Sequence, residues 1–292
     1  MRFAVPGRLR PGLPAIGVGL GVLAAVSCYQ QIQLPPLNPV PTGAHRPGKF
    51  IWRDLLTEDV AGAQQFYGEL LGWKFRSVAG GDYVVILHDS VPIGGIVRAN
   101  ARTKVKVSQW VSWLSVTDVD AAAAAVTEAG GQVLRGPLVL EGRGRLAVVT
   151  DPEGALLVLV RSTDGDPADA DSPEGGWLWT ELWTHDKPAS LTFYEHLAGY
   201  TVEQREVAGA AYSVLVGSGA PRAGVVANPF DSVATNWLPY IRVADVAATV
   251  ARVQELGGRV LVEPREDRRA GTAAILADPT GAAFVAQKWP IQ

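Results

Sequence analysis

The chain of 292 residues has one cysteine, Cys28, so no disulfide can form within it. Its 26 basic and 29 acidic residues nearly balance, and no basic run interleaved with aromatic residues occurs. This composition gives no reason to expect a nucleic-acid partner. Phosphate-binding loops, dinucleotide fingerprints and nucleophile elbows are also missing from the sequence. The four histidines have no ligand-pair spacing, so they predict no metal site.

The N-terminal residues carry the pattern of an export signal. Arg2, Arg8 and Arg10 precede an apolar run over residues 13–26, and small residues then lead to Cys28. The run is too short to span a membrane comfortably. A cysteine directly after a small-residue site resembles a bacterial lipoprotein signal, which implies lipidation of Cys28 and a place in the cell envelope, outside the cytoplasmic membrane. An ordinary signal peptide, an uncleaved anchor and a misassigned start are the alternatives.

Composition also divides the rest of the chain. Residues 29–48 contain five prolines and almost no periodicity, which predicts an extended tether. Residues 164–176 are acidic and rich in proline and glycine, which is typical of a linker. We therefore expect a signal segment over residues 1–28, a first domain over residues 49–163 and a second over residues 177–290.

The two expected domains repeat one another. Residues 52–73 read WRDLLTEDVAGAQQFYGELLGW, and residues 179–200 read WTELWTHDKPASLTFYEHLAGY. Matching positions lie 127 residues apart here and again in the second half of each unit. Between these stretches Tyr83 matches Tyr212 at a separation of 129, so a short insertion is later cancelled. A repeat held over this length indicates a duplicated architecture.

Each unit divides again into two βαβββ modules. In the first module a strand over residues 50–56 precedes a helix that Asp59 caps and Gly72 ends, because the apolar residues between them recur with helical spacing. Three short strands follow near residues 74–78, 83–88 and 93–98. The expected modules are residues 48–100, 108–162, 176–228 and 236–289.

These phrases resemble the vicinal oxygen chelate superfamily, which includes glyoxalase I, extradiol dioxygenases and bleomycin-resistance proteins. The similarity covers residues 49–289 and rests on the paired modules, the Asp-x₆-Phe-Tyr phrase and the Asp-Pro-x-Gly hairpin. It implies an α+β fold in which each pair of modules forms a curved mixed sheet around a cavity, with the helices outside. We predict two such glyoxalase-like domains in tandem.

The resemblance also places the metal ligands of the superfamily's enzymes on the first and last strands of the modules. The residues at these positions here are Trp52, Val111, Val158, Trp179, Leu238 and Val285. Indole and aliphatic side chains offer no lone pair to a divalent cation. We therefore predict no metal and no cofactor of this kind.

Alternation along the first strands predicts which side chains face each cavity, since every second residue shares a face. The predicted ligand-binding residues are Trp52, Asp54, Trp113, Trp179, Glu181, Trp183 and Tyr240. Aromatic side chains beside an acid suit a flat or amphipathic organic molecule. The same pattern is also typical of a packed core whose acids are satisfied by backbone donors, and this structural interpretation stays open.

Three functional hypotheses follow from these patterns. The first is a metal-independent protein, anchored in the envelope, that binds or sequesters an amphipathic organic molecule. The second is an enzyme of the superfamily, a glyoxalase-like lyase or dioxygenase-like, with a non-standard metal site. The third is a structural or interaction protein. Because one chain holds both pairs of modules, we expect a monomer or a weak homo-oligomer.

Overall fold

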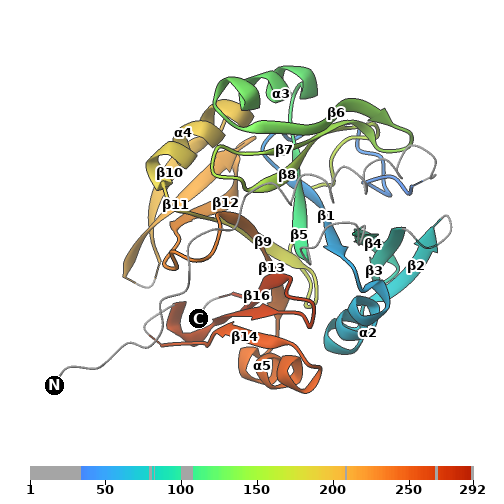
Figure 1. Ribbon diagram of the computed structural model, residues 1–292, viewed down its shortest axis with the longest axis vertical. Coiled ribbons are helices and arrows are strands. Elements are labelled where there is room, and N and C mark those ends of the chain that lie inside the picture. The colour runs from blue at the N-terminus through green and yellow to red at the C-terminus, as the bar shows by residue number, and fades with distance from the viewer. Residues whose placement is uncertain are drawn as a thin grey trace.

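The computed structural model of the protein describes residues 34–78, 81, 83–99, 108–207, 209–266 and 269–290. These residues form two eight-stranded mixed sheets with four α-helices, so the predicted α+β architecture is confirmed (Figure 1). The expected signal segment and Cys28 lie outside the described residues. Among the residues that are described, no helix has both the length and the apolar character to cross a membrane.

The first sheet contains both modules of the first domain. Its strands run in the order β2-β3-β4-β1-β5-β8-β7-β6. The bounds are β1 Phe50–Thr57, β2 Lys74–Val78, β3 Tyr83–His88, β4 Val91–Arg98, β5 Gln109–Ser115, β6 Gln132–Leu140, β7 Gly144–Thr150 and β8 Leu156–Ser162. The central strands β1 and β5 are antiparallel, and each pairs in parallel with the last strand of its own module.

The second sheet repeats this arrangement in the order β10-β11-β12-β9-β13-β16-β15-β14. The bounds are β9 Trp177–Thr184, β10 Thr201–Val207, β11 Ala210–Gly217, β12 Ala220–Ala227, β13 Asn236–Val243, β14 Arg259–Val262, β15 Ala273–Ala277 and β16 Ala283–Lys288. A short 3₁₀ turn, η3 (Arg269–Gly271), precedes β15. The sheets therefore follow the repeat that the sequence shows.

Each module has one helix, and an aspartate caps each of them. The helices are α2 Val60–Leu71, α3 Val119–Glu128, α4 Lys187–Ala198 and α5 Val246–Glu255. The side chain of Asp59 accepts the N–H of Gly62 at 2.9 Å, and Gly72 ends α2 in the left-handed conformation at φ 71°. This is the capping chemistry that the sequence predicts, because an N-cap carboxylate satisfies a free amide and glycine tolerates positive φ.

The two domains meet through their helical sides. In Figure 1 α3 lies beside α4 at the top, and α2 lies beside α5 at the bottom. Two apolar cores fill these junctions, and each contains residues of both domains. Tyr67 donates to Asp278 at 3.3 Å, and Tyr194 donates to Asp151 at 2.9 Å. The Phe-Tyr and Asp-Pro-x-Gly motifs of the repeat therefore bond reciprocally across the domain junction.

The strand β6 is longer than the sequence predicts. The sequence pattern predicts a strand near residues 132–134, and Gly136 and Pro137 interrupt the chain just beyond it. The structure instead continues pairing with β7 as far as Leu140, with register shifts on either side of Arg135. These bulges accommodate the interruption, and the resulting hairpin carries Arg143 over the concave face of the sheet.

Candidate functional site

An acidic side chain lies at the centre of each concave face. In the first domain this residue is Asp54, which is buried on β1. Its Oδ1 accepts hydrogen bonds from Trp52 Nε1 at 2.9 Å and from Tyr83 Oη at 2.8 Å. Its Oδ2 accepts from Trp113 Nε1 at 3.1 Å. The carboxylate is thus satisfied by three aromatic donors, which stabilises its charge away from water.

A fully buried arginine covers this cluster. The guanidinium of Arg143 lies 4.5 Å from the ring centre of Trp52 and 5.3 Å from those of Tyr83 and Trp113. Its Nη2 donates to Tyr83 Oη at 3.1 Å. Stacking on several rings stabilises a cation that has left water. Burial, with a smaller opposing effect from Arg143, raises the pKa of Tyr83 far above its ordinary value, so this hydroxyl remains a neutral donor.

The first cavity is filled by the chain itself. Residues 34–44, here called the N-terminal strap, form no helix or strand, yet Leu34 and Leu37 are buried in the same apolar cluster as Trp52 and Trp113. The carbonyl of Pro35 accepts from Arg143 Nε at 3.0 Å. This part of the expected tether therefore packs into the first domain, because its leucines find an apolar concave face.

The second domain repeats the cluster around Glu181. Its Oε1 accepts from Tyr212 Oη at 2.7 Å. Its Oε2 accepts from Tyr240 Oη at 2.7 Å and from Trp183 Nε1 at 2.8 Å. Trp179 Nε1 in turn donates to Tyr212 Oη at 2.9 Å. Burial, followed by the negative charge of Glu181, raises the pKa of Tyr212, so it donates as a neutral phenol.

An arginine also covers the second cluster. Arg269, in the turn η3, stacks over Tyr212 and Tyr240 at 5.3 and 5.1 Å from the ring centres. Its Nη2 pairs with Glu181, and its Nη1 donates to Gln287 at 3.2 Å. Burial acts to lower the pKa of Arg269, but the charge and hydrogen bond of Glu181, together with the nearby Tyr240 and Tyr212, outweigh it and raise the pKa above its ordinary value. The guanidinium is therefore charged at all accessible pH values.

The two domains differ in what lies above the arginine. In the second domain a cavity of about 280 Å³ remains open. It is lined by Leu178, Trp179, Arg205, Val207, Tyr212, Val214, Pro221, Arg269, Gln287 and Trp289. Its wall is mostly apolar, with a few convergent polar groups, which is the usual composition of a small-molecule site. Repeated residues thus form one filled and one open cavity.

The donor chemistry of these clusters does not suit a divalent metal. In the described part of the chain, the side chains that bond to each carboxylate are N–H and O–H donors, with a guanidinium beside them, whereas a metal needs several lone-pair donors. No group of three His, Cys, Asp or Glu side chains gathers in the described part of the chain. Two of the expected metal positions, Val158 and Val285, are buried in apolar clusters. Arginine thus provides the positive charge beside each acid.

The seven predicted ligand-binding residues separate into two groups in the structure. Only Trp179 lines the open cavity, while Glu181, Trp183 and Tyr240 lie directly around its floor. The remaining three, Trp52, Asp54 and Trp113, are covered by Arg143 and the strap. Ligand binding by any of the seven stays a prediction.

Four further described residues belong to the clusters, and the sequence patterns did not predict them as site residues. Tyr83 and Tyr212 were visible as a repeated pair, and this recurrence could have identified them. Arg143 and Arg269 come from hairpins of different length, so the separation of 127 does not align them.

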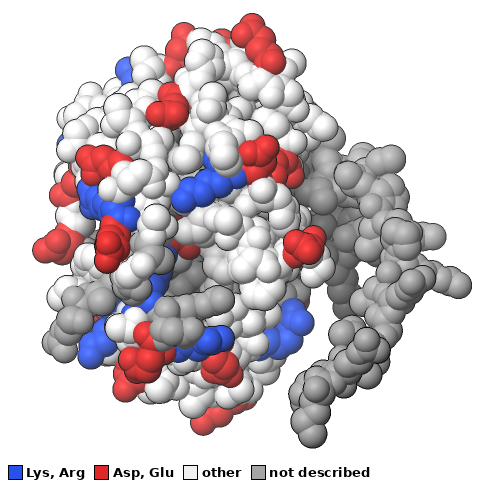
Figure 2. Space-filling view, turned by 90° about the vertical axis from the view of Figure 1, so that its left-hand side faces the viewer, with Lys and Arg blue, Asp and Glu red and all other residues white. Residues whose placement is uncertain are grey.

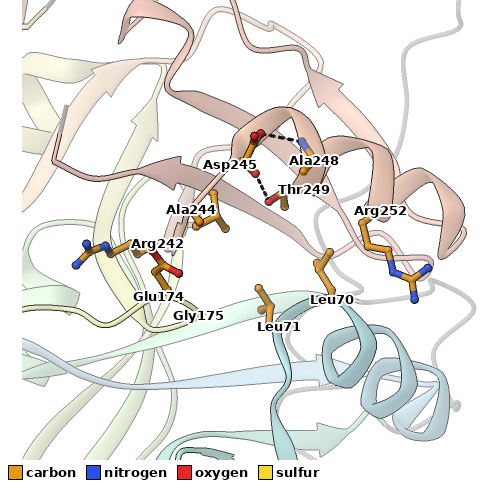
Figure 3. A pocket seen from close by; sticks show the side chains of 11 residues that line it. Leu70, Leu71, Glu174, Gly175, Arg242, Ala244, Asp245, Ala248, Thr249 and Arg252 are labelled. Atoms are coloured by element: carbon orange, nitrogen blue, oxygen red, sulfur yellow. Dashed lines mark hydrogen bonds between the residues drawn. The ribbon is translucent and has the colours of Figure 1, made fainter. Parts of the chain in front are cut away.

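A second hollow, of about 390 Å³, lies where α2 meets α5 (Figure 3). Leu70 and Leu71 face the first turn of α5, where Asp245 accepts the N–H of Ala248 at 2.9 Å. The helix cap therefore already occupies the Ala248 amide. On the face in Figure 2, acidic and basic side chains are interspersed over a largely uncharged surface.

Comparison with known proteins gives several likenesses. The model of the family described as "Glyoxalase-like domain" matches residues 51–160 and 179–286. The chain is 33% identical over 248 residues to "Putative glyoxylase CFP32" of Mycobacterium tuberculosis, across 82% of this chain and 94% of that protein. It is 31% identical over 258 residues to "Anthracycline biosynthesis protein DnrV" of Streptomyces peucetius, across 82% and 92%.

Two solved structures share the fold at low identity. The Mn(II)-bound glyoxalase from Novosphingobium aromaticivorans has a TM-score of 0.57 and 17% identity, with 82% of each chain covered. The 2,3-dioxygenase LapB from Pseudomonas sp. KL28 has a TM-score of 0.55 and 14% identity, with 85% of this chain and 93% of that one covered. These likenesses concern the arrangement of the strands and helices.

Proposed function

Because the chain belongs to the glyoxalase-like domain family of the vicinal oxygen chelate superfamily, as its motifs predicted, we propose that it uses the family's cavity to bind a small amphipathic organic molecule without a metal. The observation that carries this proposal is the open cavity of about 280 Å³ in the second domain, with Tyr212 and Arg269 in its wall. Its volume and mixed lining suit a molecule of two or three fused rings.

The lining favours an aromatic ligand. Trp179 and Trp289 contribute indole surface, and Leu178, Val207 and Val214 provide aliphatic contact. Planar molecules bind such walls by burying apolar area and by offset stacking. The name of one relative refers to anthracycline biosynthesis, and anthracyclines are polycyclic aromatic compounds. This name supports the same class of ligand for the present chain.

We extend the proposal to sequestration of the ligand at the cell envelope. The support is the signal-like pattern that ends at Cys28, together with a cavity whose described lining offers binding groups and no Ser, Thr or Cys nucleophile. Growing cells with a labelled fatty acid tests the anchor. The label should enter the wild-type protein and be missing from Cys28→Ala, whereas equal labelling of both would contradict the lipid anchor.

Calorimetric titration with 2-naphthoate tests binding in the second domain. Val214 is buried in the cavity wall, so Val214→Trp should fill the space and abolish the binding heat. Val40 is 71% exposed on the strap, and Val40→Trp adds the same side chain outside the cavity. Thermal melts should show both variants folded. Undiminished binding by a folded Val214→Trp would refute the proposed site.

A further inference from the structure

The strap shows what the concave face of the first domain accepts. Two buried leucines, Leu34 and Leu37, lie against its aromatic wall, and between them the Pro35 carbonyl bonds to Arg143. The occupant of the first cavity is therefore an apolar body with one oxygen acceptor directed at the guanidinium. The strap therefore shows which kind of group fits beside the guanidinium.

The second domain presents the same donor, with no such occupant among the residues that the structure describes. The terminal nitrogens of Arg269 bond to Glu181 and Gln287, and its Nε makes no hydrogen bond to any residue that the structure describes. In the first domain the equivalent Nε is the atom that binds the strap carbonyl. Arg269 lines the cavity with about a fifth of its side chain accessible. Its free direction is thus available to a bound molecule.

The charges of the cavity wall support the same reading. Among the described residues that line it are two arginines, Arg205 and Arg269, and no acidic side chain. Glu181 lies behind the wall and is 2% exposed, so it neutralises part of the charge of Arg269 without facing the cavity. Arg205 is likewise paired with Glu203 at 2.7 Å. A cationic ligand would face two guanidinium groups and no carboxylate in the described lining, whereas an oxygen acceptor would meet donors.

We propose that the ligand of the second cavity presents a carbonyl or carboxylate oxygen to Arg269 and lays an aromatic body against Trp179 and Leu178. The strap of the first domain then mimics that ligand, because it places apolar side chains and one carbonyl oxygen at the matching positions. This inference rests on the proposed binding function and adds the chemical class of the ligand. A hydrogen bond from a charged donor in a largely dry site changes affinity by roughly 10- to 100-fold.

Four probes with one naphthalene body test the inference by calorimetry on the full chain. They are 2-naphthoate, 2-acetylnaphthalene, 2-ethylnaphthalene and 2-(aminomethyl)naphthalene. The first two should bind roughly 10- to 100-fold more tightly than the ethyl compound, because only they offer an oxygen to Arg269. The ammonium compound should bind most weakly. Equal binding of all four would overturn the inference but leave the proposed function intact, whereas binding of none would refute the function itself.

Variants then assign the preference to one arginine. Arg269→Met should remove the advantage of the oxygen-bearing probes, whereas Arg205→Met should preserve the advantage of 2-acetylnaphthalene. Loss of that advantage in Arg205→Met alone would overturn the assignment. Should Arg269→Met fail to fold, Arg269→Lys keeps a charge beside Glu181 but lacks the Nε–H, and it should reduce the advantage. An unchanged advantage in a folded Arg269 variant would also overturn it.

Discussion

Replacing Leu37 with alanine should release the N-terminal strap from the first domain. Leu37 is 3% exposed and packs in the cluster that contains Trp52, Tyr83 and Trp113. Nearly all of its side chain therefore leaves water when the strap is seated. The strap has no helix or strand of its own, so these side-chain contacts and a few hydrogen bonds hold it.

The magnitude follows from the atoms removed. Leucine to alanine deletes three carbons, each worth about 0.8 kcal/mol when buried, which gives about 2.4 kcal/mol. The strap can shift toward the wall and close part of the space, so we add no further penalty for a cavity. At 1.36 kcal/mol per tenfold change, the equilibrium for local opening of the strap should rise roughly 60-fold.

Hydrogen exchange followed by mass spectrometry measures this opening. The amides of Thr42 and Gly43 donate to the carbonyl of Asp164 at 3.0 and 3.1 Å, so their protection reports a seated strap. Protection there should fall roughly 60-fold in Leu37→Ala, while α5 exchanges as in the wild type. Val40→Ala alters an exposed side chain of the same strap and should leave the protection unchanged. Equal protection in both variants would refute the view that leucine burial seats the strap.

Three further outcomes are expected. Arg53 is buried against Trp177, and burial lowers its pKa to about 9. Because a buried charge costs free energy, Arg53→Met should raise the free energy of unfolding at pH 7 by about 1–3 kcal/mol in thermal melts. A fall in the free energy of unfolding would contradict this. Tyr67→Phe removes the hydrogen bond to Asp278 and should lower the free energy of unfolding by about 1–3 kcal/mol in denaturant titrations. An unchanged midpoint would show that this bond does not stabilise the domain junction. Hydrogen bonds from Arg222 and Lys49 lower the pKa of Asp169, so the stability that its carboxylate contributes should be present above pH 4 and lost as the pH falls below it. In thermal melts across this range, Asp169→Asn should lose less stability on acidification than the wild type. An identical pH profile of the two proteins would disprove the contribution.

The fold could be predicted from the sequence because the phrases that specify it are local. Asp59 and Gly72 mark the ends of a helix by capping chemistry that needs no distant partner. Strand alternation likewise placed Trp52 and Glu181 on the concave faces. The duplication repeats each of these patterns in the second half of the chain, and two occurrences in the same register are not expected by chance.

The difference between the two cavities could not be predicted, because it depends on contacts distant in sequence. Leu37 is buried against residues of the first sheet that lie more than ten positions away in the sequence. The proline-rich stretch around it contains no pattern that predicts this contact. Arg143 reaches the first cluster only because β6 continues past its interruption. Whether a concave face is filled or open is decided by such side chains, and local periodicity does not report them.

The reciprocal bonds between the domains have a consequence for assembly. Tyr67 and Asp151 belong to one half of the chain, and their partners Asp278 and Tyr194 belong to the other. Each half therefore carries one donor and one acceptor of the same pair, which is the condition for an isologous contact. Two copies of one half therefore carry the groups needed for both Tyr–Asp bonds with each other. The linker determines which two halves pair, whereas the bonds themselves come from residues that every half contains. In the intact chain this surface is buried between the two domains, whereas a separate half would expose it to another copy of the same half.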